Sequence, residues 1–371
     1  MKFNGTNWVY VGVAGFSSNM TIYNKISFDN VGTPYVVNRD FGNGHKINVL
    51  KFNGSNWVNV GNAGFSLGAV NYPSIAIDNA GTPFVAFSDS VKGWKATVMK
   101  FNGSIWDTVG AAGFSISKAN SVSIAINSSG EPHLIYQEDW VNNNKATVMK
   151  FIGSSWSVLG NVGISEGYAN YASILLDIND IPTAIYSDNY YTFKAVMKKF
   201  ESGVWNMKGN QGFSVGRADY TNIALDTIGK PYVVFCDWSR NKKATVTKFN
   251  GVSWDTVGNA GFSAGMAFMT NMAIDNNNTP YVVYRDVANA DKIAAMKYNG
   301  TAWVAVGNQG FSAGQISAPN ITFDKNGIPY VAFADYSNSG RTTVMKFNGT
   351  VWVNVGVSGF TQYSSSGKVL F

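Results

Sequence analysis

The hydrophobic residues of this chain occur in short runs that are rich in β-branched and aromatic side chains and are separated by Gly, Asn, Asp and Pro. Between residues 74 and 109, four such runs predict β-strands over Ser74–Asp78, Pro83–Asp89, Lys95–Phe101 and Trp106–Val109. The Asn-Gly pair between the last two favours a tight hairpin, because both central residues of that turn need positive φ. No stretch keeps the spacing of an amphipathic helix. We therefore expect an all-β chain of four-stranded units, whose strands are named a, b, c and d in order.

The sequence of this four-stranded unit repeats along the chain. Each unit contains the phrase KFNG-x-x-W-x-x-VG with small variations, and its tryptophan recurs every 49 residues with one interval of 50, at Trp8, Trp57, Trp106, Trp156, Trp205, Trp254, Trp303 and Trp352. A four-stranded unit of this length is typical of a β-propeller blade. A linear β-solenoid is the alternative, although its repeats are usually shorter and lack three hairpins. We expect the repeated tryptophans to pack between blades.

The two ends of the chain decide the expected number of blades. Seven complete units are predicted, over residues of about 22–60, 71–109, 121–159, 171–208, 220–257, 270–306 and 319–355. Residues 1–11 supply a further c–d hairpin, and residues 368–371 resemble the start of another strand a. We expect a single domain of eight blades, in which these end segments share a closing blade that lacks strand b. Seven blades with a free hairpin are the alternative.

The repeated sequence contains "IAIDNAGTP", "YVVY" with an Asp two residues later, and "KATVMKFNG" followed by the Trp and the Val-Gly pair. It resembles the degenerate propeller repeats of secreted and surface proteins, many of them bacterial. The resemblance covers essentially the whole chain and implies a fold rather than an activity. The chain lacks both the Asp-box of sialidases and the Trp-Asp dipeptide of the Trp-Asp repeat family.

The composition and charge of the chain limit the kinds of binding partner that we expect. Charged residues make up only 13% of the chain, and the net charge of +6 is spread without any run of Lys or Arg. This argues against nucleic acid. No stretch approaches the roughly 20 apolar residues of a membrane helix, so no membrane insertion is expected. The single cysteine, Cys236, excludes an intramolecular disulfide and is interpreted as a small strand residue.

The chain begins inside a repeat, without a signal peptide. The protein is then either cytosolic or a mature or excised piece of a longer precursor. The abrupt start inside a repeat favours the second interpretation, which places the protein outside the cell or on its surface.

The connections between strands differ in variability, and this predicts a functional face. The a–b and c–d links are short and similar in every copy, whereas the d–a links are long and the b–c links vary most. Variable loops on a rigid scaffold are where binding residues usually lie. In a propeller, the b–c and d–a links share one face, which we expect to be the functional one.

A carboxylate repeats on that face. Strand b is predicted to end at an aspartate in every complete unit: Asp40, Asp89, Asp139, Asp188, Asp237, Asp286 and Asp335. A cation follows six residues later in each: Lys46, Lys95, Lys145, Lys194, Lys243, Lys292 and Arg341. The structural interpretation is a cross-strand ion pair or a loop cap. The functional one is a ring of seven carboxylate sites that hold sugar hydroxyls or cations.

Aromatic residues occur in the same loops. The b–c links contain the remaining tryptophans and two comparable tyrosines as candidate ligand-binding residues: Trp94, Trp140, Trp238, Tyr190 and Tyr336. Such residues could stack against the apolar face of a sugar ring or simply pack on the d–a loop. Four tyrosines precede strand a and could equally line a central channel: Tyr23, Tyr72, Tyr171 and Tyr220.

Catalytic patterns are weak. The two histidines, His45 and His133, have no partners at metal-ligand spacing, and no nucleophile-elbow text occurs. An enzyme needs unlike residues to converge on one site, whereas this chain repeats the same residues in each unit. We therefore predict no enzymatic activity, no metal site and no cofactor; a sialidase-like or lyase enzyme is a distant third reading.

Two functions follow from these patterns. The first is a non-enzymatic extracellular protein that binds glycans or another cell-surface ligand through several weak, equivalent sites. The alternative is a structural module for surface or filament assembly, which self-associates when a neighbouring subunit completes the closing blade.

Overall fold

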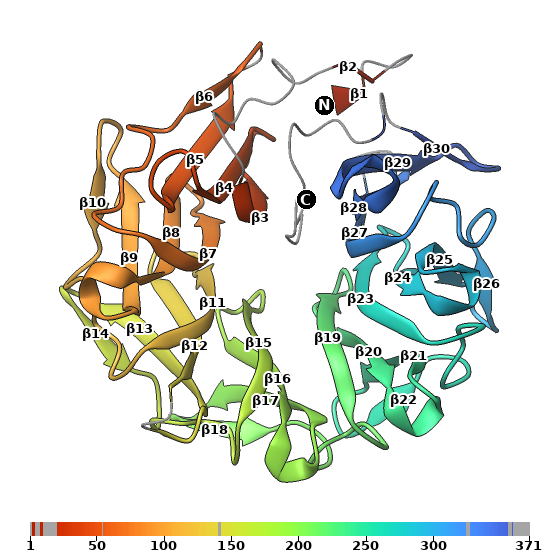
Figure 1. Cartoon of the computed structure of the whole chain (residues 1–371). Coiled ribbons are helices and arrows are strands. Elements are labelled where there is room, and N and C mark those ends of the chain that lie inside the picture. Colours follow the sequence, from red (N-terminus) through yellow and green to blue (C-terminus); the bar gives the residue numbers. More distant parts are fainter. Residues whose placement is uncertain are drawn as a thin grey trace. The chain divides into compact units, whose positions relative to one another are not determined.

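The computed structural model describes residues 2–3, 8–9, 21–53, 55–139, 142–323, 327–354 and 358. It contains seven antiparallel four-stranded sheets, each built from consecutive strands, and one two-stranded sheet. We number the four-stranded sheets as blades 1 to 7 in chain order and keep the names a to d for their strands. These are the blades of an all-β β-propeller (Figure 1).

The strands of blades 1 to 4 are β3 (Thr21–Phe28), β4 (Pro34–Asp40), β5 (Lys46–Phe52), β6 (Trp57–Asn59), β7 (Val70–Ile77), β8 (Pro83–Asp89), β9 (Lys95–Phe101), β10 (Trp106–Thr108), β11 (Ala119–Ile126), β12 (Pro132–Glu138), β13 (Ala146–Ile152), β14 (Ser155–Val158), β15 (Ala169–Leu176), β16 (Pro182–Asp188), β17 (Lys194–Glu201) and β18 (Val204–Met207).

The strands of blades 5 to 7 are β19 (Ala218–Leu225), β20 (Pro231–Asp237), β21 (Lys243–Phe249), β22 (Trp254–Thr256), β23 (Ala267–Ile274), β24 (Pro280–Asp286), β25 (Lys292–Tyr298), β26 (Trp303–Ala305), β27 (Ile316–Phe323), β28 (Pro329–Asp335), β29 (Arg341–Phe347) and β30 (Trp352–Asn354).

Three-residue 3-10 turns occur in several b–c loops, at η1 (Ser90–Lys92), η3 (Asn189–Tyr191), η4 (Trp238–Arg240), η5 (Val287–Asn289) and η6 (Tyr336–Asn338). In the part of the chain that the structure describes, no helix is long and apolar enough to cross a membrane.

The chain divides into two compact units. One holds blades 1 to 4, and the other holds β1 (Lys2–Phe3), β2 (Trp8–Val9) and blades 5 to 7, together with the start of β17. Within each unit the first strands of successive blades contact one another, as β3, β7, β11 and β15 do in the first unit and β19, β23 and β27 in the second.

Strand b forms the core of every blade. In blade 2, Phe84, Val85, Ala86 and Phe87 are all at most 4% exposed. The strand lies between strands a and c, and the neighbouring blades of its unit cover its two faces. This explains why it reads as a continuous apolar run rather than as an alternating one.

Strand a is longer than the sequence predicts, because it contains a β-bulge. In blade 2 it starts at Val70 instead of Ser74, and the register shifts between Asn71 and Ser74. The bulged residue takes a positive φ, which is 51° at Tyr72. The equivalent residues of the other blades are Tyr23, Ser121, Tyr171, Tyr220, Met269 and Ala318, with φ between 48° and 57°.

The prediction that the repeated tryptophans pack between blades is confirmed for six of them, whose indole N–H donates to a carbonyl in the segment after the preceding blade: Trp106, Trp156, Trp205, Trp254, Trp303 and Trp352. Trp106 of blade 2 donates its indole N–H to the carbonyl of Val60 in the segment after blade 1 (2.5 Å) and stacks on Phe65 at a centroid distance of 4.4 Å. Trp303 of blade 6 repeats this with Val257 (2.6 Å) and Phe262 (4.1 Å). These two seams each combine one hydrogen bond with one aromatic stack, whereas Trp205 keeps the hydrogen bond, to the Leu159 carbonyl (2.6 Å), but has Ile164 in place of the phenylalanine.

The expected eighth blade is not found, and the prediction of eight blades is wrong. Among the described residues, β1 and β2 pair only with each other, through two residues each, while seven sheets have four strands. A c–d hairpin without strands a and b lacks the long buried strand that forms the core of every other blade. The strand expected over 368–371 lies outside the described residues.

Candidate functional site

The b–c loop is a rigid turn that begins at a buried carboxylate. Asp237 of blade 5 is 1% exposed. Its Oδ1 accepts hydrogen bonds from the backbone N–H (2.9 Å) and the hydroxyl (2.6 Å) of Ser239. Its Oδ2 accepts one from the hydroxyl of Thr245 (3.0 Å) on strand c. The carboxylate therefore caps the 3-10 turn and joins it to the next strand.

The same device recurs with small variations. Asp89 and Asp335 accept from a turn N–H and from Thr97 and Thr343, respectively. Asp40 bonds to Gly42 N–H and to two asparagine side chains instead. Of the seven predicted aspartates, Asp40, Asp89, Asp188, Asp237, Asp286 and Asp335 are at most 4% exposed. Their acceptor atoms bond to donors of the protein itself, in the b–c turn and, in several blades, on strand c or in the d–a segment, which is the capping role.

Blade 3 uses a different residue from the one expected. Ala119 pairs with Glu138 in the register where Val70 pairs with Asp89. Glu138 is fully buried and accepts a hydrogen bond from the Ser117 hydroxyl. Asp139 lies one residue later and forms an ion pair with Lys118 (3.5 Å). The loop has one extra residue before strand c, which also accounts for the single interval of 50.

In blades 1, 2, 5, 6 and 7 the cation six residues later is the register partner of the aspartate. Asp89 is the register partner of Lys95, and Asp237 is that of Lys243. None of the ion pairs found among the described residues joins such a pair. The carboxylate accepts the N–H groups of its loop instead, as in blade 5, and the half-buried lysine opposite it makes no such ion pair.

The residue just before strand c is held in a left-handed conformation. Its φ lies between 56° and 70° at His45, Trp94, Asn144, Phe193, Lys242, Asp291 and Gly340. For a non-glycine residue this costs about 1–2 kcal/mol. A hydrogen bond into the next blade offsets part of that cost: the Trp94 carbonyl accepts the N–H of Ala119 (2.9 Å), and the Lys242 carbonyl accepts that of Ala267 (2.9 Å).

The candidate aromatic residues differ in exposure. Tyr190 is 69% exposed, Tyr336 55% and Trp238 42%, whereas Trp94 is half-buried. Trp140 lies outside the described residues. The three exposed rings follow the capping aspartate by one or two residues, in blades 4, 5 and 7. They therefore stand on the rigid turn rather than on a free loop.

Trp238 lies at the centre of a charged cluster in blade 5. Its indole N–H donates to Asp219 Oδ2 (2.7 Å), whose Oδ1 accepts from Arg217 Nε (2.8 Å). The Arg217 guanidinium lies 4.7 Å from the Trp238 ring centroid, and the Lys242 ammonium lies 4.1 Å from it. Two cations and one carboxylate thus surround one partly exposed ring.

Cys236 lies beneath this cluster and is fully buried. Burial, and secondarily Asp219, raises the pKa of its thiol to about 12. A thiol with this pKa is almost entirely protonated at neutral pH and is a poor nucleophile. The sequence interpretation of Cys236 as a small strand residue fits this environment.

Tyr190 and Tyr191 form a second aromatic group, in the b–c loop of blade 4, with their rings edge to face at 5.1 Å. Asp188 caps this turn and accepts N–H groups from Tyr190, Glu166 and Gly167, each at 3.0 Å. Burial nevertheless raises the pKa of Asp188. It also raises that of Tyr191, followed by the effect of the Glu166 charge.

The tyrosines that precede strand a occupy its bulge. In the first unit, Tyr23 and Tyr72 lie on neighbouring first strands with ring centroids 5.5 Å apart. Burial raises the pKa of Tyr72, and Tyr23 adds to the effect. Tyr171 is 41% exposed. Residues in this strained conformation are a hint of function only when other evidence agrees.

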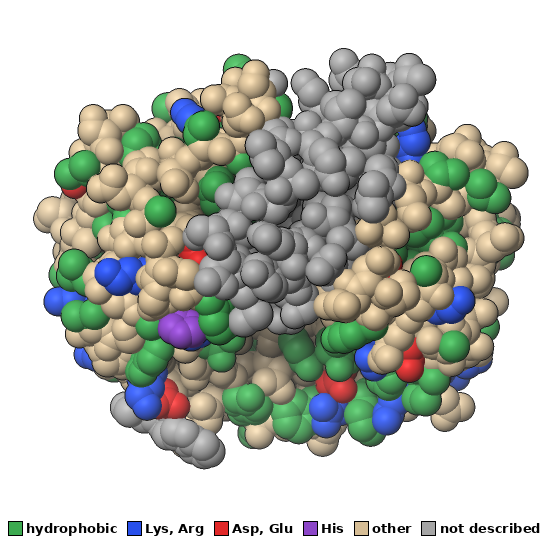
Figure 2. All heavy atoms as spheres, turned by 45° about the horizontal axis from the view of Figure 1, so that its top comes forward, with side chains coloured by type: hydrophobic (Ala, Val, Ile, Leu, Met, Phe, Trp, Pro, Cys, Tyr) green, Lys and Arg blue, Asp and Glu red, His purple; other side chains and the backbone are tan. Residues whose placement is uncertain are grey.

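Charge is dispersed over the surface. Figure 2 shows Lys and Arg side chains scattered singly among hydrophobic and uncharged ones on the visible face. Among the described residues there is no group of three or more His, Cys, Asp or Glu side chains that could hold a metal ion. The described b–c loops therefore present aromatic and polar side chains.

Comparisons of sequence give no relative: no protein-family model matches the chain, and no curated protein sequence matches it. Solved structures do resemble it. An ulvan lyase, described as a new family of polysaccharide lyase and solved bound to -[GlcA(1-4)Rha3S]-, is 12% identical, with a TM-score of 0.55 over 94% of this chain and 96% of that chain. AofleA from Arthrobotrys oligospora is 12% identical, with a TM-score of 0.51 over 93% and 89%. A fucose-recognising fungal lectin with a six-bladed β-propeller, from Aleuria aurantia, is 14% identical, with a TM-score of 0.45 over 79% and 96%.

The seven blades define this chain as a β-propeller, and identities this low support the fold alone. The likeness to a lyase also corrects one prediction: the statement that the chain is not an enzyme is wrong as an exclusion, because an enzyme shares its fold. Regular repeats do not prevent unlike residues from meeting between two blades.

Proposed function

We propose that this β-propeller binds carbohydrate through aromatic side chains on its b–c loops. The observation that carries the proposal is the exposure of Tyr190, Trp238 and Tyr336 on turns that buried carboxylates hold rigid. An exposed aromatic side chain on a fixed turn offers a ring face on which a sugar can stack. A rigid platform also loses little conformational entropy on binding.

The polar neighbours of these rings suit a sugar. Asp219, Arg217 and Lys242 surround Trp238 with acceptors and donors for hydroxyl groups. The ulvan lyase, which has the same fold, was solved with a bound oligosaccharide. This supports the suitability of the β-propeller scaffold for binding oligosaccharides, whereas the proposal itself rests on the residues named above. Recognition of glycans at several blades would place the protein outside the cell or on its surface.

Binding to a glycan array tests the proposal. We expect the wild-type protein to bind a subset of glycans, and Trp238→Ala, Tyr190→Ala and Tyr336→Ala each to weaken that binding about tenfold, since one stacked ring contributes about 1–1.5 kcal/mol. Val252→Ala is the matched control, because Val252 is 84% exposed in the c–d hairpin of blade 5, away from the b–c loop. Failure to bind any glycan, or equal binding by all four variants, would refute the proposal.

A further inference from the structure

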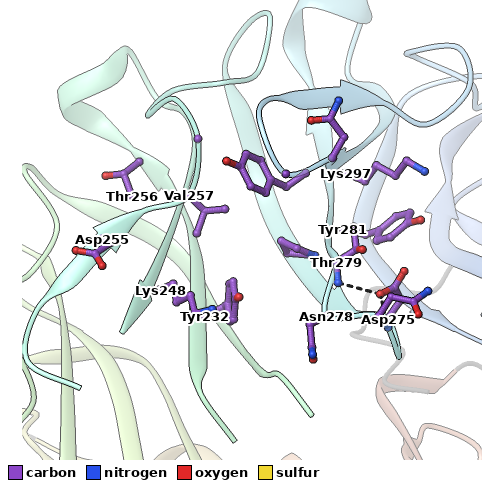
Figure 3. Close-up of a pocket in the computed structure, with 16 residues that line it drawn as sticks. Tyr232, Lys248, Asp255, Thr256, Val257, Asp275, Asn278, Thr279, Tyr281 and Lys297 are labelled. Atoms are coloured by element: carbon purple, nitrogen blue, oxygen red, sulfur yellow. Dashed lines mark hydrogen bonds between the residues drawn. The ribbon is translucent and has the colours of Figure 1, made fainter. Parts of the chain in front are cut away.

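A cleft of about 790 Å³ lies between blades 5 and 6, within one unit (Figure 3). It is lined by the a–b turn of blade 6, the c–d hairpin that follows β25, and strands of both blades. It is therefore at the end of the blades opposite to the b–c loops, on the face that sequence variability did not single out.

The wall from blade 5 is a polar row. Tyr232 on β20 is the register partner of Lys248 on β21, which is the partner of Asp255 on β22. Cross-strand partners project from the same face of a sheet, so these side chains share the face that borders the cleft. The Lys248 ammonium lies 4.8 Å from the Tyr232 ring centroid. Asp255 is exposed and accepts a hydrogen bond from the Asn250 side chain (2.8 Å).

The wall from blade 6 places a tyrosine close to the backbone of blade 5. Tyr298 packs against Gly258, where an added Cβ would lie 2.8 Å from a carbon of the ring. The same ring packs on Trp303 at a centroid distance of 5.8 Å. Asn278 accepts the N–H of Thr227 (2.8 Å), which ties the a–b turns of the two blades together. The width of the cleft is therefore fixed before any ligand binds.

Tyr298 is a departure from the repeat. The same position is phenylalanine in the other six blades, at Phe52, Phe101, Phe151, Phe200, Phe249 and Phe347. Six blades pack without this hydroxyl, so folding does not require it. Among the described residues no hydrogen-bond partner of the hydroxyl is found. It is a donor and an acceptor that is unused by the blade.

Lys248 is held less tightly than its counterparts in blades 3 and 4. Lys150 and Lys199 each lie 2.8 Å from a carboxylate oxygen, of Glu131 and Asp177 respectively. Lys248 lies 3.9 Å from Asp226, and its side chain is 33% exposed. Because Coulomb attraction falls with distance, Asp226 competes less with an incoming anion for Lys248 than Glu131 and Asp177 do for their lysines.

We propose that this cleft is a second binding site, for a saccharide unit that carries a carboxylate or sulfate group. The Lys248 ammonium and the Tyr298 hydroxyl bind the acidic group. Asp255 and the exposed side chains of Asn277 and Asn299 take the ring hydroxyls. The volume accommodates a short oligosaccharide rather than a single small ion. This site is independent of the loop aromatics.

Titration calorimetry with a galacturonic acid tetrasaccharide, a sulfated chondroitin tetrasaccharide and neutral cellotetraose tests the site. We expect at least one acidic probe to bind and cellotetraose to bind at least tenfold more weakly. Tyr298→Phe and Lys248→Met should each lower the affinity for the acidic probe about tenfold. Tyr298→Phe keeps the residue found in the other six blades, so its fold is safe.

Lys100→Met is the matched control, because Lys100 occupies the same position in blade 2. It should bind like the wild-type protein. Equal affinity for acidic and neutral probes, no binding of any probe, or unchanged affinity in both cleft variants overturns the proposal. Trp238→Ala separates the two sites: it weakens glycan binding at the loops and leaves the acidic probe at the cleft unaffected.

Discussion

One buried carboxylate per blade holds the b–c turn together. In blade 5 it satisfies the Ser239 N–H, the Ser239 hydroxyl and the Thr245 hydroxyl at once. A buried donor without an acceptor costs about 1–3 kcal/mol, so each of these bonds matters more when it is lost than when it is formed.

Asp237→Ala should therefore lower the free energy of unfolding by about 2–3 kcal/mol, because it leaves buried donors unsatisfied. Urea unfolding followed by tryptophan fluorescence measures it. Lys243→Ala, at the register partner of Asp237 and without an ion pair to it, is the control and should change stability by about 0.5 kcal/mol or less. An Asp237→Ala protein of unchanged stability that had lost glycan binding would instead assign this carboxylate to the ligand.

At the scale of the elements, the a–b turns of the unit that holds blades 1 to 4 contain three carboxyl groups whose pKa values are lowered. The hydrogen bond from Lys150 holds the pKa of Glu131 below its ordinary value. Burial pushes the pKa of Asp177 upward, but hydrogen bonds from Lys199 and from two backbone N–H groups outweigh it. The side-chain and backbone bonds from Ser128 lower the pKa of Asp180. These groups stabilise the folded chain above their unfolded pKa values of about 4.

Stability should consequently fall as the pH drops from 5 toward 2, since carboxyls with depressed pKa values must be protonated in the folded state. Asp188 opposes the trend, because its raised pKa makes folding favour its protonated form. Urea unfolding at a series of pH values measures the slope. Lys199→Met should cost about 1 kcal/mol at pH 6 and flatten the slope. Lys100→Met, with no ion-pair partner among the described residues, should leave it unchanged; a steeper slope in Lys199→Met contradicts the assignment.

At the scale of the whole molecule, exposed aromatic residues occur on the described b–c turns of blades 4, 5 and 7, which predicts avidity. Binding of a soluble monovalent oligosaccharide should be weak, whereas binding to a surface densely coated with the same glycan should be at least a hundredfold tighter. Surface plasmon resonance at two coating densities measures the difference. The Tyr190→Ala/Trp238→Ala/Tyr336→Ala variant should lose the gain at high density, while single variants lose part of it. Equal affinity at both densities would mean that one blade acts alone.

The repeated sequence predicted the four-stranded blade correctly because strand and turn preferences depend on residues close together in the chain. Alternation of apolar runs with Asn-Gly and Asp-Asn turns defines strands b, c and d, and the recurrent tryptophan marks the seam between blades. Strand a was placed too late because its bulged residue is not a glycine, and a bulge at Tyr72 leaves no mark in the sequence. The prediction of eight blades failed because sequence copies were counted as blades, although β1 and β2 pair only with each other.

The role of the aspartates could have been found from the sequence. A threonine or asparagine eight residues after Asp40, Asp89, Asp237 and Asp335 supplies the second donor to each carboxylate. This partner on strand c, together with the turn N–H groups, favours a cap over a ligand site. The one-residue insertion that puts Glu138 at this position could be recognised only from the strand register in the structure.

The sequence by itself determined the repeat, the four strands of a blade and the residues that seal one blade to the next, because strand period and turn chemistry act over a few residues. Only the tertiary structure decided which way each carboxylate faces, how many sheets reach four strands, and that Tyr232, Lys248 and Tyr298 from two blades border one cleft. These depend on side-chain direction and on the register of chain segments far apart in sequence. A one-residue change of register turns every side chain of a strand to the other face and changes which residues lie opposite one another.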